Sequence, residues 1–240
     1  MSREAVKISN KKSSFKFPMQ KSERILGCAY IPFHAAILPL LLGLVFAIFG
    51  VELSSPYQSL IFFIISFILT LVIMFKFLKS SFSDMVDEFW RAIQALILGY
   101  VLYRALFWVS VLLLERVMMS DNPNSEAIIT DIKDNFRVMI VVASVLAPIV
   151  EETLFRGALF GTIRQKNRIA AYVVSTLLFS VFHIWSYLIV DFNWETLILF
   201  VQYIPPSIAL AWCYERGGTI WAPILLHSGI NLLASIQVRV

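Results

Sequence analysis

Long runs of apolar residues, separated by short polar segments, divide this chain of 240 residues. A helix needs about 20 predominantly apolar residues to cross the hydrocarbon core of a bilayer. The runs that meet or approach this length lie at about 25–50, 57–78, 90–114, 136–163, 169–190, 196–214 and 219–238. The pattern predicts about seven transmembrane helices, and it leaves open an eighth segment that is re-entrant or split.

The composition agrees with a membrane protein. Apolar residues make up 59% of the chain, charged residues only 15%, and the mean hydropathy is +0.78. A soluble domain carries about a quarter charged residues. We therefore expect an all-α, polytopic membrane helical bundle around a central polar cavity. Residues 1–24 would form a basic cytosolic N-terminal segment, and residues 25–240 the transmembrane domain.

Charged residues outside the runs are distributed unevenly. Lysine and arginine concentrate in the N-terminal segment and in alternate loops, whereas the segments 120–134 and 191–195 are acidic. Cytoplasmic loops of membrane proteins carry an excess of basic residues, so we expect a cytoplasmic N-terminus. Each basic residue near an anionic lipid surface contributes about 1 kcal/mol of attraction. We expect contact with anionic lipids at the inner face, and no binding of nucleic acid, because the basic residues are spread over several loops.

A few ionisable side chains interrupt the apolar runs, and such residues are rare and usually functional inside a membrane. Away from the ends of the runs they are His34, Arg104, Glu151, Glu152, Arg156, His183 and His227, and Asn231 accompanies them as a strong hydrogen-bonding group. The sequence assigns no role to two of them. His34 lies between two prolines, where a freed backbone carbonyl could satisfy it, and Arg104 could pair with a carboxylate or reach an interface.

The other residues occur at helical spacings. Glu152 and Arg156 are four residues apart, so they share one helix face and can form an ion pair, whereas Glu151 is rotated by about 100° away from that face. His227 and Asn231 have the same spacing of four residues. Both of these side chains should therefore point toward the same neighbouring helix.

Depth in the membrane brings residues from different helices together. With a rise of 1.5 Å per residue, Glu151, His183 and Asn231 should lie about 20 Å from the inner face, and His227 about 14 Å from it. Phe179 precedes His183 by one turn and should pack beside the imidazole. We therefore expect side chains from three helices to meet in one layer near the middle of the bilayer.

These groups could hydrolyse an amide bond without a covalent intermediate. A glutamate in a low-dielectric cavity can act as a base near neutral pH, and with a neutral imidazole it can hold and deprotonate water. A second imidazole and an amide can donate hydrogen bonds to a developing oxyanion. The chain contains no G-x-S-x-G sequence for a nucleophilic serine.

Two other interpretations of the same residues stay open. Glu151, His183 and His227 match the ligand set of a zinc hydrolase, although the chain lacks an HExxH helix and the three residues lie on separate runs. Alternatively, the polar groups form a buried network that only holds the helices together.

Three stretches resemble, in order and spacing, the motifs of the CPBP family of intramembrane endopeptidases. This family includes the Rce1-type CAAX prenyl proteases and the bacterial Abi proteins, and its pattern is EExxxR, then FxxxH, then HxxxN or HxxxD. The matching stretches are "APIVEETLFRGALFG" (147–161), "STLLFSVFHI" (175–184) and "GGTIWAPILLHSGINLLAS" (217–235). The resemblance covers about residues 137–236, which would form the catalytic core.

The resemblance implies a role for each matching residue. Glu151 and His183 would activate the attacking water, His227 and Asn231 would stabilise the oxyanion, and Glu152 with Arg156 would shape the site. The family has been described both as metalloproteases and as metal-free, glutamate-dependent proteases. We favour the metal-free mechanism with no cofactor, and zinc bound by Glu151, His183 and His227 is the alternative.

The resemblance does not identify a substrate. We expect a membrane-associated peptide or protein, cut toward the cytosolic side of the membrane. The short chain and plain termini favour a bacterial cell membrane, where small members resemble proteins of bacteriocin self-immunity, pheromone maturation or surface-protein processing. The alternatives are a non-catalytic membrane immunity or binding protein and a small transporter, but the sequence shows no internal repeat of the transporter kind.

Overall fold

The computed structural model describes residues 15, 17–190 and 192–239, and within them it contains helices and no strand. The first half comprises α1 (Lys21–Pro32), the π-helical turn η1 (Phe33–Ile37), α2 (Leu38–Ile48), α3 (Ser55–Asp87), α4 (Phe89–Met118) and α5 (Pro123–Asp134). The segment that follows comprises α6 (Phe136–Val141), the π-helical turn η2 (Val142–Leu146), α7 (Ala147–Glu152), the π-helical segment η3 (Thr153–Phe160) and α8 (Gly161–Arg164). The remainder comprises α9 (Arg168–Phe182), α10 (Trp185–Val190), α11 (Trp194–Ile198), the 3-10 turn η4 (Leu199–Tyr203), α12 (Ile204–Gly217) and α13 (Trp221–Arg239).

Six helical stretches of the described chain are long and apolar enough to cross a membrane. They are Lys21–Ile48, Ser55–Asp87, Phe89–Met118, Phe136–Arg164, Trp194–Gly217 and Trp221–Arg239. Each coincides with one of the apolar runs, which confirms the expected all-α, polytopic bundle. The chain is therefore an integral, multi-pass membrane protein.

The run at 169–190 is not one continuous helix, so the expected count of about seven transmembrane helices is not confirmed. Helix α9 ends at Phe182 after 15 residues, and a turn separates it from the short helix α10. The backbone N–H groups of His183 and Ile184 bond to carbonyls three residues back, those of Ser180 and Val181. Such tight bonds end an α-helix, and hydropathy does not reveal them because the residues around the turn are themselves apolar.

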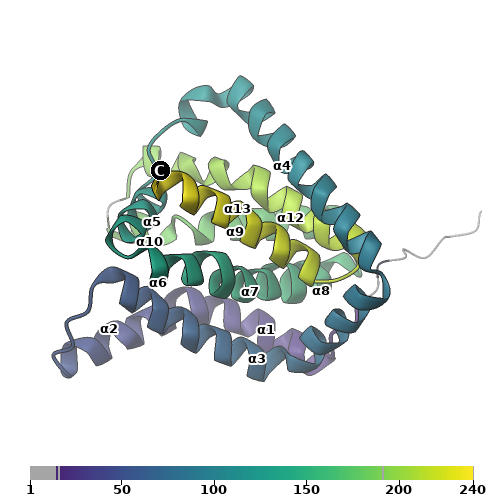
Figure 1. Ribbon diagram of the computed structural model, residues 1–240, viewed down its shortest axis with the longest axis horizontal. Coiled ribbons are helices and arrows are strands. Elements are labelled where there is room, and N and C mark those ends of the chain that lie inside the picture. Colours follow the sequence, from purple (N-terminus) through teal and green to yellow (C-terminus); the bar gives the residue numbers. More distant parts are fainter. Residues whose placement is uncertain (1–14, 16, 191, 240) are drawn as a thin grey trace, which may run out of the picture.

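The stretch that carries the acidic pair lies at the centre of the bundle. From α6 to α8 it is one helical rod. In its most apolar segment of 18 residues, 61% of the residues are buried, compared with 6–39% in the same segments of the other five long stretches. Figure 1 shows this rod between a layer formed by α1–α3 and a layer that contains α9, α12 and α13. The central position explains how charged side chains on this rod can be shielded from lipid.

The N-terminal region packs against the bundle earlier than expected. Helix α1 begins at Lys21, and Met19 belongs to the hydrophobic core, with Phe15 and Phe17 packed against it. The buried Glu23 accepts a hydrogen bond of 2.8 Å from the backbone N–H of Phe77 in α3. The last residues of the expected cytosolic segment 1–24 are therefore part of the folded bundle, while residues 1–14 and 16 lie outside the described part of the chain.

Candidate active site

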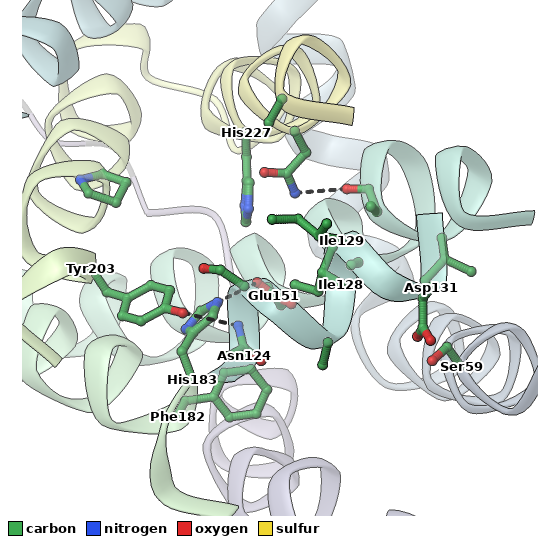
Figure 2. Close-up of a pocket in the computed structure, with 18 of the residues that line it drawn as sticks. Ser59, Asn124, Ile128, Ile129, Asp131, Glu151, Phe182, His183, Tyr203 and His227 are labelled. Carbon is green, nitrogen blue, oxygen red and sulfur yellow. Dashed lines mark hydrogen bonds and ion pairs between the residues drawn. The ribbon is translucent and has the colours of Figure 1, made fainter. Parts of the chain in front are cut away.

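A cavity of about 1250 Å³ lies beside the central rod. It is lined by Glu151 from α7, His183 at the end of α9, and His227 and Asn231 from α13. Figure 2 shows the labelled side chains of Glu151, His183 and His227 directed toward one another. The four residues predicted to share one layer are thus brought together by three separate parts of the chain.

A proline and a π-helical turn shape the rod just before the acidic pair. The backbone N–H of Ala147 bonds to Val142, five residues back, and Pro148 has no N–H. The carbonyl of Ala143 therefore lacks its usual helical donors. Asn231 donates its side-chain N–H to that carbonyl at 2.8 Å. This bond ties α13 to the rod about two turns before Glu151, and it leaves the second amide hydrogen of Asn231 available.

Glu151 and His183 face each other across the cavity. Nε2 of His183 lies 3.9 Å from Oε2 of Glu151, which is longer than a hydrogen bond. The other ring nitrogen, Nδ1, lies 2.8 Å from the carbonyl oxygen of Phe179. A carbonyl can only accept, so Nδ1 carries the proton and Nε2 of the neutral ring is an acceptor. Two acceptors therefore face each other at a separation that one water molecule can bridge with hydrogen bonds of about 2.8 Å.

The second glutamate of the pair points away from the cavity into a fully buried ion pair. Oε1 of Glu152 lies 3.1 Å from an N–H of Arg156, as the spacing of four residues predicted, and both side chains are 0% exposed. The same oxygen lies 2.8 Å from Nδ1 of His227. Glu152 thus accepts from two cationic or polar donors at once, and it links the rod to α13.

Arg156 is held on its remaining sides by neighbouring helices. Its guanidinium lies 4.0 Å from the ring centroid of Phe179, a cation–π contact. Another N–H donates to the hydroxyl and to the carbonyl of the buried Ser207 in α12, at 3.1 and 3.3 Å. Ser207 belongs to none of the sequence motifs, and only the packing of α12 against the rod reveals its contribution.

The contact with Glu152 determines what His227 can do. Its Nδ1 donates to the carboxylate, so Nε2 is the nitrogen left for the cavity. A neutral ring in this tautomer can only accept at Nε2. To donate a hydrogen bond from Nε2 into the cavity, His227 must carry protons on both nitrogens.

The proposed zinc ligands do not form a three-ligand set. Among the described residues, no three histidine, cysteine or acidic side chains are gathered closely enough to hold a metal ion. His227 directs Nδ1 to Glu152, so only its Nε2 could face a ligand in the cavity.

The two residues without an assigned role lie differently from each other. His34 is buried at the cavity wall, where its Nδ1 lies 3.0 Å from the hydroxyl of Ser66, so its partner is a side chain rather than the expected carbonyl. Arg104 is exposed on α4 and rests against the rings of Phe107 and Trp108. It forms no ion pair with a carboxylate of the described chain.

One aromatic residue of the site was missed by the sequence analysis. Tyr203 lines the same cavity, and its ring is stacked on that of His183 with centroids 4.4 Å apart. It lies at the end of η4, just before two prolines. No spacing rule connects it to His183, so only the fold identifies it.

This site, on a helical bundle that crosses a membrane, has the acid, imidazole and amide groups of a hydrolase. Comparison with known proteins shows which family this part of the chain resembles. Residues 133–233, which include Glu151, His183, His227 and Asn231, match the model of the family described as type II CAAX prenyl endopeptidase Rce1-like. This segment is therefore similar to the Rce1-like family, which agrees with the resemblance to CPBP proteins.

Curated relatives are bacterial membrane or uncharacterised proteins. The chain is 30% identical over 118 residues to a Bacillus subtilis (strain 168) protein named "Putative membrane peptidase YdiL", a match that covers 49% of this chain and 43% of YdiL. It is 25% identical over 135 residues to UPF0177 protein YxdF of Lactococcus lactis (strain IL1403), covering 55% of this chain and 69% of YxdF. The match thus spans less than half of YdiL. No solved structure matches the chain significantly.

Proposed function

We propose that this protein is an intramembrane endopeptidase that hydrolyses a peptide bond in a membrane-associated peptide or protein. The observation that supports the proposal is the pair of acceptors, Glu151 and His183, held 3.9 Å apart in a cavity that also contains His227 and Asn231. The match of residues 133–233 to an endopeptidase family model supports the same reaction.

In the proposed mechanism, one water molecule donates a hydrogen bond to Glu151 and another to His183. The water oxygen attacks the carbonyl carbon of the substrate while Glu151 takes the released proton. The carbonyl oxygen becomes an oxyanion, which accepts hydrogen bonds from protonated His227 and from the second amide hydrogen of Asn231. Collapse of the tetrahedral intermediate breaks the C–N bond, and the proton held by Glu151 passes to the leaving nitrogen.

The proposed mechanism uses no metal ion, and the zinc-dependent mechanism is the alternative. The bonds of each Nδ1 to a protein oxygen leave Nε2 of both rings free, so they are compatible with either mechanism. A zinc ion would need Nε2 of both rings and the carboxylate of Glu151 together. Activity in the presence of a zinc chelator distinguishes the two mechanisms.

We propose a bacterial cell membrane as the location, with the N-terminus in the cytoplasm and anionic lipids at the inner face. The excess of basic residues in alternate loops supports the orientation, and the bacterial relatives support the source. A role in bacteriocin immunity, pheromone maturation or surface-protein processing would supply short membrane-bound peptides as substrates.

The decisive experiment measures cleavage by the purified full chain in lipid nanodiscs. The substrates are synthetic peptides with an apolar segment of about 20 residues, and products are identified by mass spectrometry. We expect cleavage by the wild type, none by Glu151→Gln, and wild-type cleavage by Glu126→Gln. Glu126 is the matched control because it is exposed on α5 and lies outside the cavity lining.

Each outcome has a defined meaning. Equal cleavage by the wild type and Glu151→Gln would refute Glu151 as the base. Loss of wild-type activity with a zinc chelator, restored by zinc, would replace the metal-free mechanism with the metal-dependent one. A wild type that binds these peptides without cutting any of them would favour the non-catalytic immunity or binding protein.

A further inference from the structure

The imidazole of His183 is poorly held by its own segment of chain. The residue follows the last residue of α9, and the next helix, α10, contains no buried residue. Among the described residues, the one hydrogen bond of the ring runs from Nδ1 to the carbonyl of Phe179 in the preceding turn. Because this bond fixes only one atom of the ring, contacts with other elements help to fix its orientation.

That support comes from Tyr203. The two rings are stacked, with centroids 4.4 Å apart and planes inclined by 24°. The rings of Phe179 and Phe182, both in α9, also pack against the imidazole, at centroid distances of 4.5 and 5.4 Å. The tyrosine ring therefore covers a face of His183 while Nε2 remains directed toward Glu151.

The tyrosine ring is itself fixed through its hydroxyl. Asn124 donates to the hydroxyl at 3.1 Å, and the hydroxyl donates to Asn122 at 3.3 Å. One of the dashed lines in Figure 2, between Tyr203 and Asn124, marks this bond. The neighbouring Gln202 donates to the carbonyls of Val117 and Ser120 and accepts from Asn122. The start of α5 and the end of α4 thus hold η4 in place.

We propose that Tyr203 is a positioning residue that keeps His183 in the orientation and tautomer needed to share a water molecule with Glu151. Without the stacked ring, the imidazole can rotate about its side-chain bonds, and Nε2 leaves its place 3.9 Å from Glu151. A displacement of about 1 Å in a catalytic group can lower a rate on the order of 10²-fold. The hydroxyl holds the ring, so its removal alone should have a smaller effect than removal of the ring.

The first test does not depend on peptidase activity. The chain has 3 histidines, so ¹⁵N-histidine labelling gives a simple spectrum that single substitutions assign. Wild-type His183 should show one protonated nitrogen, Nδ1, and one unprotonated nitrogen, Nε2. We expect Tyr203→Leu to give signals averaged between tautomers, and Tyr203→Phe to retain the wild-type pattern. Tyr203→Met, which keeps more side-chain length, replaces the leucine variant if that variant does not fold.

The second test rests on the proposed function and measures cleavage kinetics on the peptides described above. Tyr203→Leu should lower kcat about 10- to 100-fold with little change in KM. Tyr203→Phe, which keeps the ring, should have a kcat much closer to that of the wild type. Tyr100→Leu is the matched control, because Tyr100 lies on α4 and does not line the cavity. It should keep wild-type kcat and the wild-type His183 signals.

The outcomes separate this inference from the proposed function. Unchanged His183 signals in the leucine or methionine variant would overturn the positioning role, whatever happens to kcat. A raised KM with unchanged kcat would also overturn it, because Tyr203 would then act in substrate binding. If the wild type cleaves no peptide but the His183 signals change as expected, the peptidase assignment fails and the role of Tyr203 in orienting the ring stands.

Discussion

Breaking the buried ion pair between Glu152 and Arg156 should be among the most damaging single changes in this protein. Both side chains are 0% exposed, so Glu152→Gln leaves a guanidinium without its counter-charge, and Arg156→Met leaves a buried carboxylate with only its contact to His227. Removing one partner of a buried pair costs about 3–5 kcal/mol. For a chain of this size, that corresponds to a fall in Tm of roughly 6–20 °C.

The double variant Glu152→Gln/Arg156→Met removes both charges, so it leaves neither one unpaired. Its loss of stability should therefore be smaller than the sum of the single losses, by a coupling energy of about 2–3 kcal/mol. Thermal unfolding with a thiol-reactive dye measures this, because Cys213 is 0% exposed and reacts only on unfolding. A Cys28→Ser background removes the signal of the half-buried second thiol.

Glu88→Gln is the matched control for the change from acid to amide. Glu88 forms an ion pair with Arg91, but both side chains are more than a third exposed. Exposed pairs contribute about 0–1 kcal/mol, so the Tm should hardly change. Additive losses in the Glu152 and Arg156 variants, with no measurable coupling, would refute the view that these two charges neutralise each other inside the bundle.

Three further predictions use the same unfolding measurement. Ser207→Ala removes one acceptor of Arg156 and should cost about 0.5–1.5 kcal/mol; an unchanged Tm would show that the hydroxyl bond is not formed. Asn231→Ala leaves the Ala143 carbonyl without a donor, so about 1–3 kcal/mol should be lost, and Asn231→Asp should not restore it because a carboxylate cannot donate. Gly217→Ala places a methyl group 2.8 Å from the Cβ of Ala222 and should cost about 1–3 kcal/mol. The control Gly43→Ala has open space around it and should be neutral or stabilising by up to about 1 kcal/mol. Equal effects at the two glycines would contradict the close approach of α12 and α13.

The central rod contains polar groups that its own helix leaves without a partner, and residues distant in the sequence bond to them. The missing N–H of Pro148 frees the Ala143 carbonyl, and Asn231, 88 positions later, bonds to it. The buried charge of Arg156 is met by Ser207, 51 positions later. Each of these hydrogen bonds fixes one helix relative to another, so the residues that stabilise the fold also set the geometry of the proposed catalytic groups.

Much of the fold could be predicted because it follows from short-range rules. An apolar run of about 20 residues has to cross the bilayer as a helix, since no other single segment satisfies its own backbone there. A spacing of four residues places two side chains on one helix face, which is why the ion pair of Glu152 and Arg156 was evident. The layer that contains Glu151, His183 and His227 followed from the constant rise of a helix.

The sequence by itself therefore determined the membrane-spanning class and the candidate residues that the structure brings together in one cavity. Only the tertiary structure decided where α9 ends, which acid faces the cavity and which is buried, and how Tyr203 comes to cover His183. The physical reason is that helix formation and membrane insertion depend on neighbours within a few turns. The orientation of a ring or a carboxylate depends on contacts between helices, and such contacts leave no periodic signal in one chain.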